Sequence, residues 1–304
     1  MIILLGPDHS GKTTFASTLQ DWGYNLFPPD QYTEYEDYIS FLTGVVPSSS
    51  TPFICDRFWF CELPYSKIVR KSEHRFSLKQ FHNLLWLTLS YRPIVILFTR
   101  KGPDYASREQ LSTEEQFDPL LAYYRGALDK IGIEYIEYDW QNPSVDLAEI
   151  ATREAEIQEE NLWWRQMQQE GCAGIGNNKD PRLVFLAEEL SSNNKNLLPF
   201  EAGPSGFFLS EVINSANSPN LTEFFLTNWR KKPSINENRS LFVKEMEKLK
   251  PETVVLLGRT AEAAIPTLEM LDISYKTIIH PAACSNYHSI PKEEYIERWR
   301  KVSE

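Results

Sequence analysis

Short apolar runs punctuate the first half of the chain, and amphipathic segments lie between them. Four of these runs predict buried strands, at residues 1–5, 51–56, 92–100 and 133–139, the last with the weakest pattern. Because strands alternate with helices, the pattern predicts a parallel sheet whose strands are joined by crossover helices. The helical periodicity occupies residues 12–21, about 32–43, 77–90 and 114–131.

A charged, Gln-rich segment interrupts this alternation. Residues 151–170 contain no Gly or Pro and predict a helix, whereas GCAGIGNNKDP at residues 171–181 breaks regular structure. We therefore expect a first domain at residues 1–150, a helical linker at residues 151–180 and a second domain at residues 181–304.

The alternation resumes in the second domain. Residues 182–189, 252–258 and 275–280 predict strands, and residues 205–216 and 239–250 predict helices. The whole chain is therefore expected to be α/β, with two such domains in succession.

The composition and net charge of the chain disfavour several classes of protein. The 304 residues are 42% hydrophobic, enough for sizeable cores, and the formal net charge is −11. An acidic chain disfavours indiscriminate binding to nucleic acids or membranes but leaves room for a local basic groove. The four cysteines form no C-x-x-C pair, so neither a zinc site nor a disulfide framework is indicated. A reducing cytoplasm fits, and the N-terminus shows neither a signal-peptide nor a transmembrane pattern.

The segment GPDHSGKTT at residues 6–14 matches the pattern G-x-x-x-x-G-K-[ST] between a strand and a helix. Its glycines allow a tight turn whose backbone N–H groups cradle phosphate oxygens. Lys12 can reach the terminal phosphates of a nucleoside triphosphate, and the Thr13 hydroxyl can hold Mg²⁺. The expected nucleotide-binding residues are Gly6, Ser10, Gly11, Lys12, Thr13 and Thr14.

Asp56 and Arg57 follow the second predicted strand, at the sheet edge where ligands bind in open α/β folds. A carboxylate there can hold Mg²⁺ or take a proton from an acceptor hydroxyl, and an arginine can grip a phosphate bidentately. The alternative is a structural Asp-Arg pair that caps the strand. The neighbouring aromatic residues Phe58, Trp59 and Tyr65 either wall a base pocket or pack in the core.

Several motifs in residues 1–150 occur in the order typical of one family. They are the loop at residues 6–14, DRFWFCELPYS, RPIVILFTRKGPDYASR and LLAYYRGALDKIGIEYIEYD. This half resembles the thymidylate kinase and deoxynucleoside kinase family. The resemblance implies a P-loop kinase fold that uses ATP and Mg²⁺.

The same resemblance implies roles for individual residues. Lys12 and Thr13 would hold ATP and Mg²⁺, Asp56 would be the base or a metal-side carboxylate, and Arg57 would clamp the acceptor. Arg100 or Arg108 would be the lid arginine that stabilises charge on the transferred phosphoryl group.

The second half carries another ordered set of motifs: VFLAEELSSNN, LPFEAGPSGFFLSEVI, FFLTNWRKKP, ETVVLLGRTAEAAIP and TIIHPAA. It resembles the uracil-DNA glycosylase superfamily, most closely the group that usually carries an iron–sulfur cluster. The resemblance implies that Phe200 stacks on a flipped pyrimidine, Asn228 reads the base edge and His280 lies against the base O2. Arg230, Lys231 and Lys232 would contact DNA phosphates.

Two departures from that family change the expectation. The cluster cysteines are absent, so we expect no iron–sulfur centre. The first loop reads Ala-Glu-Glu-Leu-Ser and lacks the family's first glycine and its Pro-Gly. Glu188 or Glu189 could activate water, or both could be solvated acids. The resemblance therefore implies the fold and the base pocket, whereas the altered loop leaves glycosidic cleavage open.

The combined expectation is an ATP-dependent kinase that acts on a thymine- or uracil-type deoxynucleotide. The acceptor would be dTMP, a modified dUMP, or 5-hydroxymethyluracil within DNA presented by the glycosylase-like domain, as bacterial viruses that hypermodify thymine would need. One alternative is an active uracil-DNA glycosylase with an accessory nucleotide kinase. Another is a kinase with a non-catalytic module that binds DNA or a base. Expected partners are a nucleotide and DNA but no membrane, in a cytoplasmic location, which is that of the host if the protein is viral.

Overall fold

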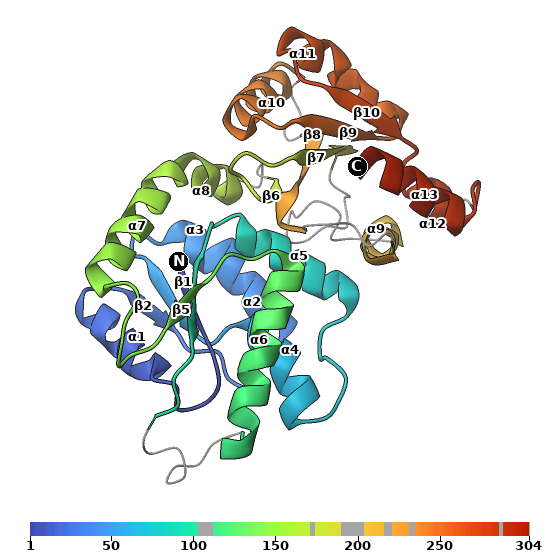
Figure 1. The fold of residues 1–304 in the computed structure, drawn as a ribbon. Coiled ribbons are helices and arrows are strands. Elements are labelled where there is room, and N and C mark those ends of the chain that lie inside the picture. The colour runs from blue at the N-terminus through green and yellow to red at the C-terminus, as the bar shows by residue number, and fades with distance from the viewer. Residues whose placement is uncertain are drawn as a thin grey trace. The chain divides into compact units, whose positions relative to one another are not determined.

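A computed structural model describes most of the chain, and the ribbon in Figure 1 shows its fold. The residues described are 1–102, 112–170, 174–189, 204–215, 221–230, 235–285 and 288–303.

The chain divides into two compact units. The first contains residues 1–77 and 91–165, and the second contains residues 78–90 and 166–304. This division differs from the expected domain ranges in two places. The first half of the expected linker, residues 151–165, groups with the first unit, and residues 78–90 from within the expected first domain group with the second.

The first unit is built on a five-stranded parallel sheet, as the alternating pattern predicted. The strand order is β2-β3-β1-β4-β5, with register pairs such as Ile2 with Ile54 and Ile2 with Ile94. The three central strands are apolar runs whose residues are almost all buried, as expected for strands covered on both faces. The strands are β1 (Ile2–Leu5), β2 (Asn25–Phe27), β3 (Phe53–Asp56), β4 (Ile94–Phe98) and β5 (Ile136–Tyr138).

Helices α1 and α7 contribute to one core with this sheet. Phe15 and Leu19 of α1 and Ile150 and Ile157 of α7 pack with Ile2 and the other inward-facing strand residues. The N-terminal ammonium of Met1 pairs with the buried Glu154 of α7 at 2.6 Å. The helices of the first unit are α1 (Lys12–Asp21), α2 (Tyr35–Ser40), α3 (Val46–Ser48), α4 (Glu62–Pro64), α6 (Phe117–Ile131) and α7 (Leu147–Glu160).

The second unit has its own five-stranded sheet, ordered β10-β9-β7-β8-β6. Four strands are parallel, and the two-residue β6 is antiparallel to β8. In its core Phe185 of β7 stacks on Trp299 of α13 (Lys292–Ser303), with ring centroids 4.4 Å apart. The strands are β6 (Ile175–Gly176), β7 (Leu183–Glu189), β8 (Phe224–Arg230), β9 (Thr253–Leu257) and β10 (Tyr275–Ile278).

Helix α5 (Leu78–Leu89), which precedes β4 in the chain, belongs to the second unit. The Trp86 indole donates to the Leu221 carbonyl at 3.3 Å. Just after α5, Ser90 Oγ accepts from the Gly176 amide at 3.0 Å, and its carbonyl accepts from the Asn178 side chain at 2.8 Å. The other helices there are α8 (Leu162–Gln169), whose start lies in the first unit, α9 (Pro204–Ser215), α10 (Ile235–Leu249), α11 (Ile265–Met270), α12 (Ala282–Ser285) and α13 (Lys292–Ser303).

The predicted elements are confirmed where the sequence pattern is long, with three local differences. The helix expected at residues 151–170 is two helices that meet at Asn161. The helix expected near residues 32–43 continues as a π-helical turn at Phe41–Val45. The short edge strands β2 and β6 were not predicted. Within the residues described, we find no helix with the length and apolar character needed to cross a membrane.

Candidate functional site

The loop at residues 6–14 joins β1 to α1 and adopts a conformation that needs its glycines. Gly6 has a φ of 132° and Gly11 a φ of 94°, both in the range that side chains disfavour. A Cβ on Gly6 would lie 2.7 Å from the Phe98 carbonyl oxygen. The backbone therefore turns tightly against β4, and α1 begins directly after it at Lys12.

Lys12 is buried and folds back over its own loop. Its ammonium donates to the carbonyls of Gly6 at 3.0 Å and Pro7 at 2.6 Å, and to Ser10 Oγ at 3.2 Å. Burial, together with the nearby Arg57 charge, lowers the pKa of Lys12 to about 8. An anionic ligand would stabilise the charged form of Lys12, because a phosphate oxygen would replace the neutral carbonyl oxygens with an opposite charge.

Thr13 and Asp56 meet at the carboxyl edge of the first sheet. Thr13 Oγ1 donates to Asp56 Oδ2 at 2.8 Å. The other carboxylate oxygen, Asp56 Oδ1, is buried and lacks a hydrogen-bond partner in the described part of the chain. A hydroxyl and an unpaired carboxylate oxygen side by side are hard oxygen donors of the kind that Mg²⁺ binds, so these residues fit the expected metal.

Arg57 is held by a buried carboxylate that the motif interpretation did not single out. Its guanidinium pairs with Asp8 Oδ1, which also accepts from the Tyr65 hydroxyl at 2.9 Å. Asp8 Oδ2 accepts from the amide and hydroxyl of Ser112 at 3.1 and 3.0 Å. Burial would raise the pKa of Asp8, but Arg57, Lys12 and these hydrogen bonds hold it below its ordinary value. Arg57 has a φ of 69°, a strained conformation at the sheet edge.

Of the two arginines predicted for the lid, Arg100 and Arg108, the structure describes only Arg100. Arg100 lies just after β4, and its Nε donates to Asp139 Oδ1 at 2.7 Å in an exposed ion pair. Arg108 lies outside the described residues. Beyond Asp139, the Trp140 ring lies against the loop, since a Cβ on Gly11 would be 3.3 Å from it. The segments after β4 and β5 thus approach the loop, and Gly102 donates to the His9 carbonyl at 2.8 Å.

A shallow hollow, open to solvent, lies beside Arg57. Phe58, Trp59 and Tyr65 line it and are almost fully buried, so they serve as core residues and as walls at once. Three arginines line the same hollow: Arg57, Arg70 and Arg75. The last two were not predicted as site residues.

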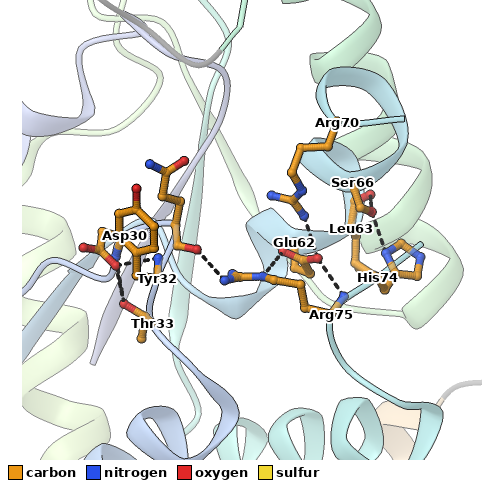
Figure 2. A network of polar contacts seen from close by, with 10 residues as sticks. Asp30, Tyr32, Thr33, Glu62, Leu63, Ser66, Arg70, His74 and Arg75 are labelled. Carbon is orange, nitrogen blue, oxygen red and sulfur yellow. Dashed lines mark hydrogen bonds and ion pairs between the residues drawn. The ribbon is translucent and has the colours of Figure 1, made fainter. Parts of the chain in front are cut away.

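Figure 2 shows how Glu62 holds these two arginines. Glu62 Oε1 accepts from Arg70 Nη2 at 2.6 Å and from the Arg75 amide at 2.8 Å, and Oε2 accepts from Arg75 Nε at 3.0 Å. Arg75 Nη1 donates to the Gln31 carbonyl. One buried carboxylate therefore fixes two guanidinium groups at the rim of the hollow.

In the second unit, Asn228 lies in β8 opposite Ala187 of β7 and is 5% exposed. The preceding Thr227 donates to both oxygens of the buried Glu245 on α10, at 3.2 and 3.0 Å. Successive strand residues face opposite sides, so Asn228 faces away from α10. Arg230, the last residue of β8, is exposed, and Lys231 and Lys232 lie outside the described residues.

His280 lies two residues after β10 and next to the end of β9. Its Nδ1 accepts from the Ala282 amide at 3.1 Å, so the neutral ring carries its proton on Nε2. A Cβ on Gly258 would lie 2.8 Å from the His280 Cβ, so the glycine allows the two loops to meet. Asn228, Gly258 and His280 all lie near the carboxyl ends of parallel strands, which form one edge of the sheet.

A comparison with protein families finds a match in this part of the chain. Residues 173–303 match the model of the Uracil DNA glycosylase superfamily. The C-terminal half carries a uracil-DNA-glycosylase-like domain. A search of curated proteins found no match to the chain.

For the other residues predicted to act in the glycosylase-like domain, Glu188, Glu189 and Phe200, the structure gives no side-chain contacts. Glu188 and Glu189 are the last residues of β7, at the same edge as Asn228. Phe200 lies outside the described residues, so its stacking role stays a prediction. Among the described residues no cluster of three His, Cys, Asp or Glu side chains is arranged to bind a metal.

Proposed function

We propose that the first unit is an ATP-dependent phosphotransferase whose acceptor is a thymine- or uracil-type deoxynucleotide. One observation carries this proposal. The Thr13 hydroxyl and the unpaired Asp56 Oδ1 lie together beside a glycine loop that holds a buried lysine. This combination suits a nucleoside triphosphate with its Mg²⁺.

The chain's own residues have distinct tasks in such a reaction. The backbone of residues 6–14 binds the phosphates, and Lys12 neutralises their charge once it exchanges its carbonyl contacts for phosphate oxygens. Thr13 and Asp56 would hold Mg²⁺, which when bound neutralises charge on the phosphates. Asp8 keeps Arg57 oriented at the entrance of the hollow, where the acceptor would lie.

A direct assay tests this proposal. The full chain is incubated with Mg²⁺ and γ-labelled ATP against dTMP, dUMP, 5-hydroxymethyl-dUMP, nucleosides and DNA that contains 5-hydroxymethyluracil. Transfer is expected to a free monophosphate or to the modified DNA, and Lys12→Ala should abolish it. Arg125→Ala is the matched control, because Arg125 is ion-paired with Glu137 on the surface of the same unit. No label in any acceptor would reject the proposal.

A second candidate function concerns the glycosylase-like domain, and the family match favours it. This domain would bind a pyrimidine flipped out of DNA, with Asn228 as the base reader, and either cleave its glycosidic bond or present it to the first unit. Cleavage of uracil-containing oligonucleotide without ATP would support excision. Salt-dependent binding of that oligonucleotide without cleavage would support a non-catalytic module, because phosphate contacts release counterions.

A further inference from the structure

The rim of the hollow beside Arg57 carries two further arginines, Arg70 and Arg75, which are held in place by the buried carboxylate of Glu62. The Glu62 side chain is 3% exposed, whereas those of Arg70 and Arg75 are 36% and 35% exposed. A single buried carboxylate thus holds two guanidinium groups, which leaves one net positive charge facing the opening. The exposed Asp30 also lines the hollow, where its Oδ1 accepts from the Tyr32 amide and the Thr33 hydroxyl. With Arg57 included, the residues that line the hollow carry three positive and two negative charges.

Both arginines are fixed before any ligand arrives. Arg75 is held on one side by Glu62 and on the other by the Gln31 carbonyl, and its guanidinium lies 5.8 Å from the Phe76 ring centroid. The Arg70 backbone amide donates to the Tyr65 carbonyl at 2.9 Å, which ties it to the wall of the hollow. Figure 2 shows the two side chains reaching Glu62 from different segments. Pre-organised guanidinium forks of this kind suit an oxyanion, which they bind through paired N–H groups.

We propose that Arg70 and Arg75 bind a phosphate group that the acceptor already carries. The site would therefore select a nucleotide over the corresponding nucleoside, with the phosphate supplied by a free monophosphate or by a DNA strand. This inference rests on the proposed kinase function, because it assigns the hollow to the acceptor. In this arrangement Arg70 and Arg75, held by Glu62, contact the acceptor in addition to Arg57 at the sheet edge.

Equilibrium binding to the full chain tests the assignment without turnover. Titration calorimetry compares dTMP with thymidine, which differ only in the phosphate. The unaltered protein should bind dTMP at least about tenfold more tightly, and Arg70→Gln should lower this ratio about tenfold while the affinity for thymidine stays the same. Arg125→Gln, which removes a comparably exposed ion-paired arginine, should change neither affinity. A second ligand is an oligothymidylate without a terminal phosphate, whose only phosphates are those of its backbone. If its affinity depends on Arg70 as strongly as that of dTMP does, a DNA strand can supply the phosphate.

Equal affinity for dTMP and thymidine in the unaltered protein would overturn the proposal. So would an Arg70→Gln variant that weakens both ligands equally, since that marks a structural role or a contact to the base. If that variant fails to fold, Arg70→Lys keeps the charge beside Glu62 and should lower the ratio by a smaller factor. An unchanged ratio in the lysine variant would exclude the paired contact. Arg70-dependent dTMP binding without phosphoryl transfer would reject the kinase and keep the phosphate site.

Discussion

If the first unit binds ATP as proposed, the buried ammonium of Lys12 should make that binding sensitive to alkaline pH. Burial, with the Arg57 charge nearby, lowers its pKa to about 8, so the empty site loses this positive charge as the pH rises through that value. A bound polyphosphate favours the charged form. We therefore expect ATP affinity to be constant below about pH 7 and to fall between about pH 8 and 9.5. Fluorescence titration of ATP at a series of pH values measures this.

The control for the pH experiment is Lys12→Met, which should bind ATP weakly and with no loss across that range. An unaltered protein whose ATP affinity is the same at both ends of the range would contradict the role of Lys12. If the ATP affinity of both proteins falls equally as the pH rises, a group other than Lys12 causes the pH dependence.

Glu62 is expected to stabilise the first unit through the arginines it compensates. Glu62→Gln leaves two guanidinium groups beside a neutral side chain, and solvent screens them in part. The free energy of unfolding should fall by about 2 kcal/mol. Glu137→Gln, in the exposed pair with Arg125, is the matched control and should cost less than about 1 kcal/mol. Urea unfolding followed by circular dichroism measures both, and equal losses would argue against a special role for Glu62.

At this scale the sequence predicts residues that belong to a contiguous motif and misses those assembled by tertiary structure. Lys12, Thr13 and Asp56 were predicted, and the structure brings Thr13 and Asp56 into contact. Asp8 stands at a variable position of its motif, and its partner Ser112 is 104 residues away. Glu62 and Arg75 form no recognisable spacing either, since their pairing depends on how the chain returns past α4.

At the scale of elements, the glycine loop before α1 should tolerate no side chain at Gly6. Gly6→Ala would place a Cβ 2.7 Å from the Phe98 carbonyl oxygen in a backbone with φ of 132°. We expect ATP affinity to fall at least about tenfold and stability to fall by more than about 1 kcal/mol. Gly126→Ala is the matched control, because Gly126 lies in helix α6 and a Cβ there meets nothing within 4 Å.

The control should be neutral or stabilising by up to about 1 kcal/mol, since alanine is the better helix former. Calorimetric ATP titration and thermal unfolding of the two variants provide the comparison. A Gly6→Ala protein that binds ATP as the unaltered chain does would show that the loop has another conformation.

Element prediction worked where one physical signal dominated. Strands β1, β3 and β4 are buried on both faces, so their residues form continuous apolar runs. Strand β2 has three residues, none of them buried, and β6 has two residues, one of them a glycine, so neither produces a pattern. The break at Asn161 escaped prediction because no Gly or Pro marks it in the sequence.

At the scale of the whole molecule, the two units are interleaved along the chain. Between β3 and β4 the chain contributes residues 78–90 to the second unit and then resumes the first sheet. Amphipathic periodicity predicted the helix at α5 but not which core it joins, because periodicity marks a buried face without naming its partner. The glycosylase-like domain thus uses a helix that lies outside the matched residues 173–303.

Trp86 tests whether that helix stabilises the glycosylase-like domain. The residue is 2% exposed, and its indole donates to the Leu221 carbonyl. Trp86→Ala should destabilise the second unit by about 3 kcal/mol, through lost burial and an unpaired carbonyl. Hydrogen exchange followed by mass spectrometry should show faster exchange in β7 and β8 and little change in β1 and β4. Trp140→Ala, at an exposed position of the first unit, is the control.

If exchange instead rises only in the first sheet, α5 belongs to that core and the division of the chain is different. If it rises in the second sheet, a fragment that starts at residue 166 lacks a helix of its own core. Loss of DNA binding or of glycosylase activity in such a fragment would then report unfolding rather than chemistry. Assays of the glycosylase-like domain therefore require the full chain, with Lys12→Ala to silence the first unit and Asn228→Ala to test the base reader.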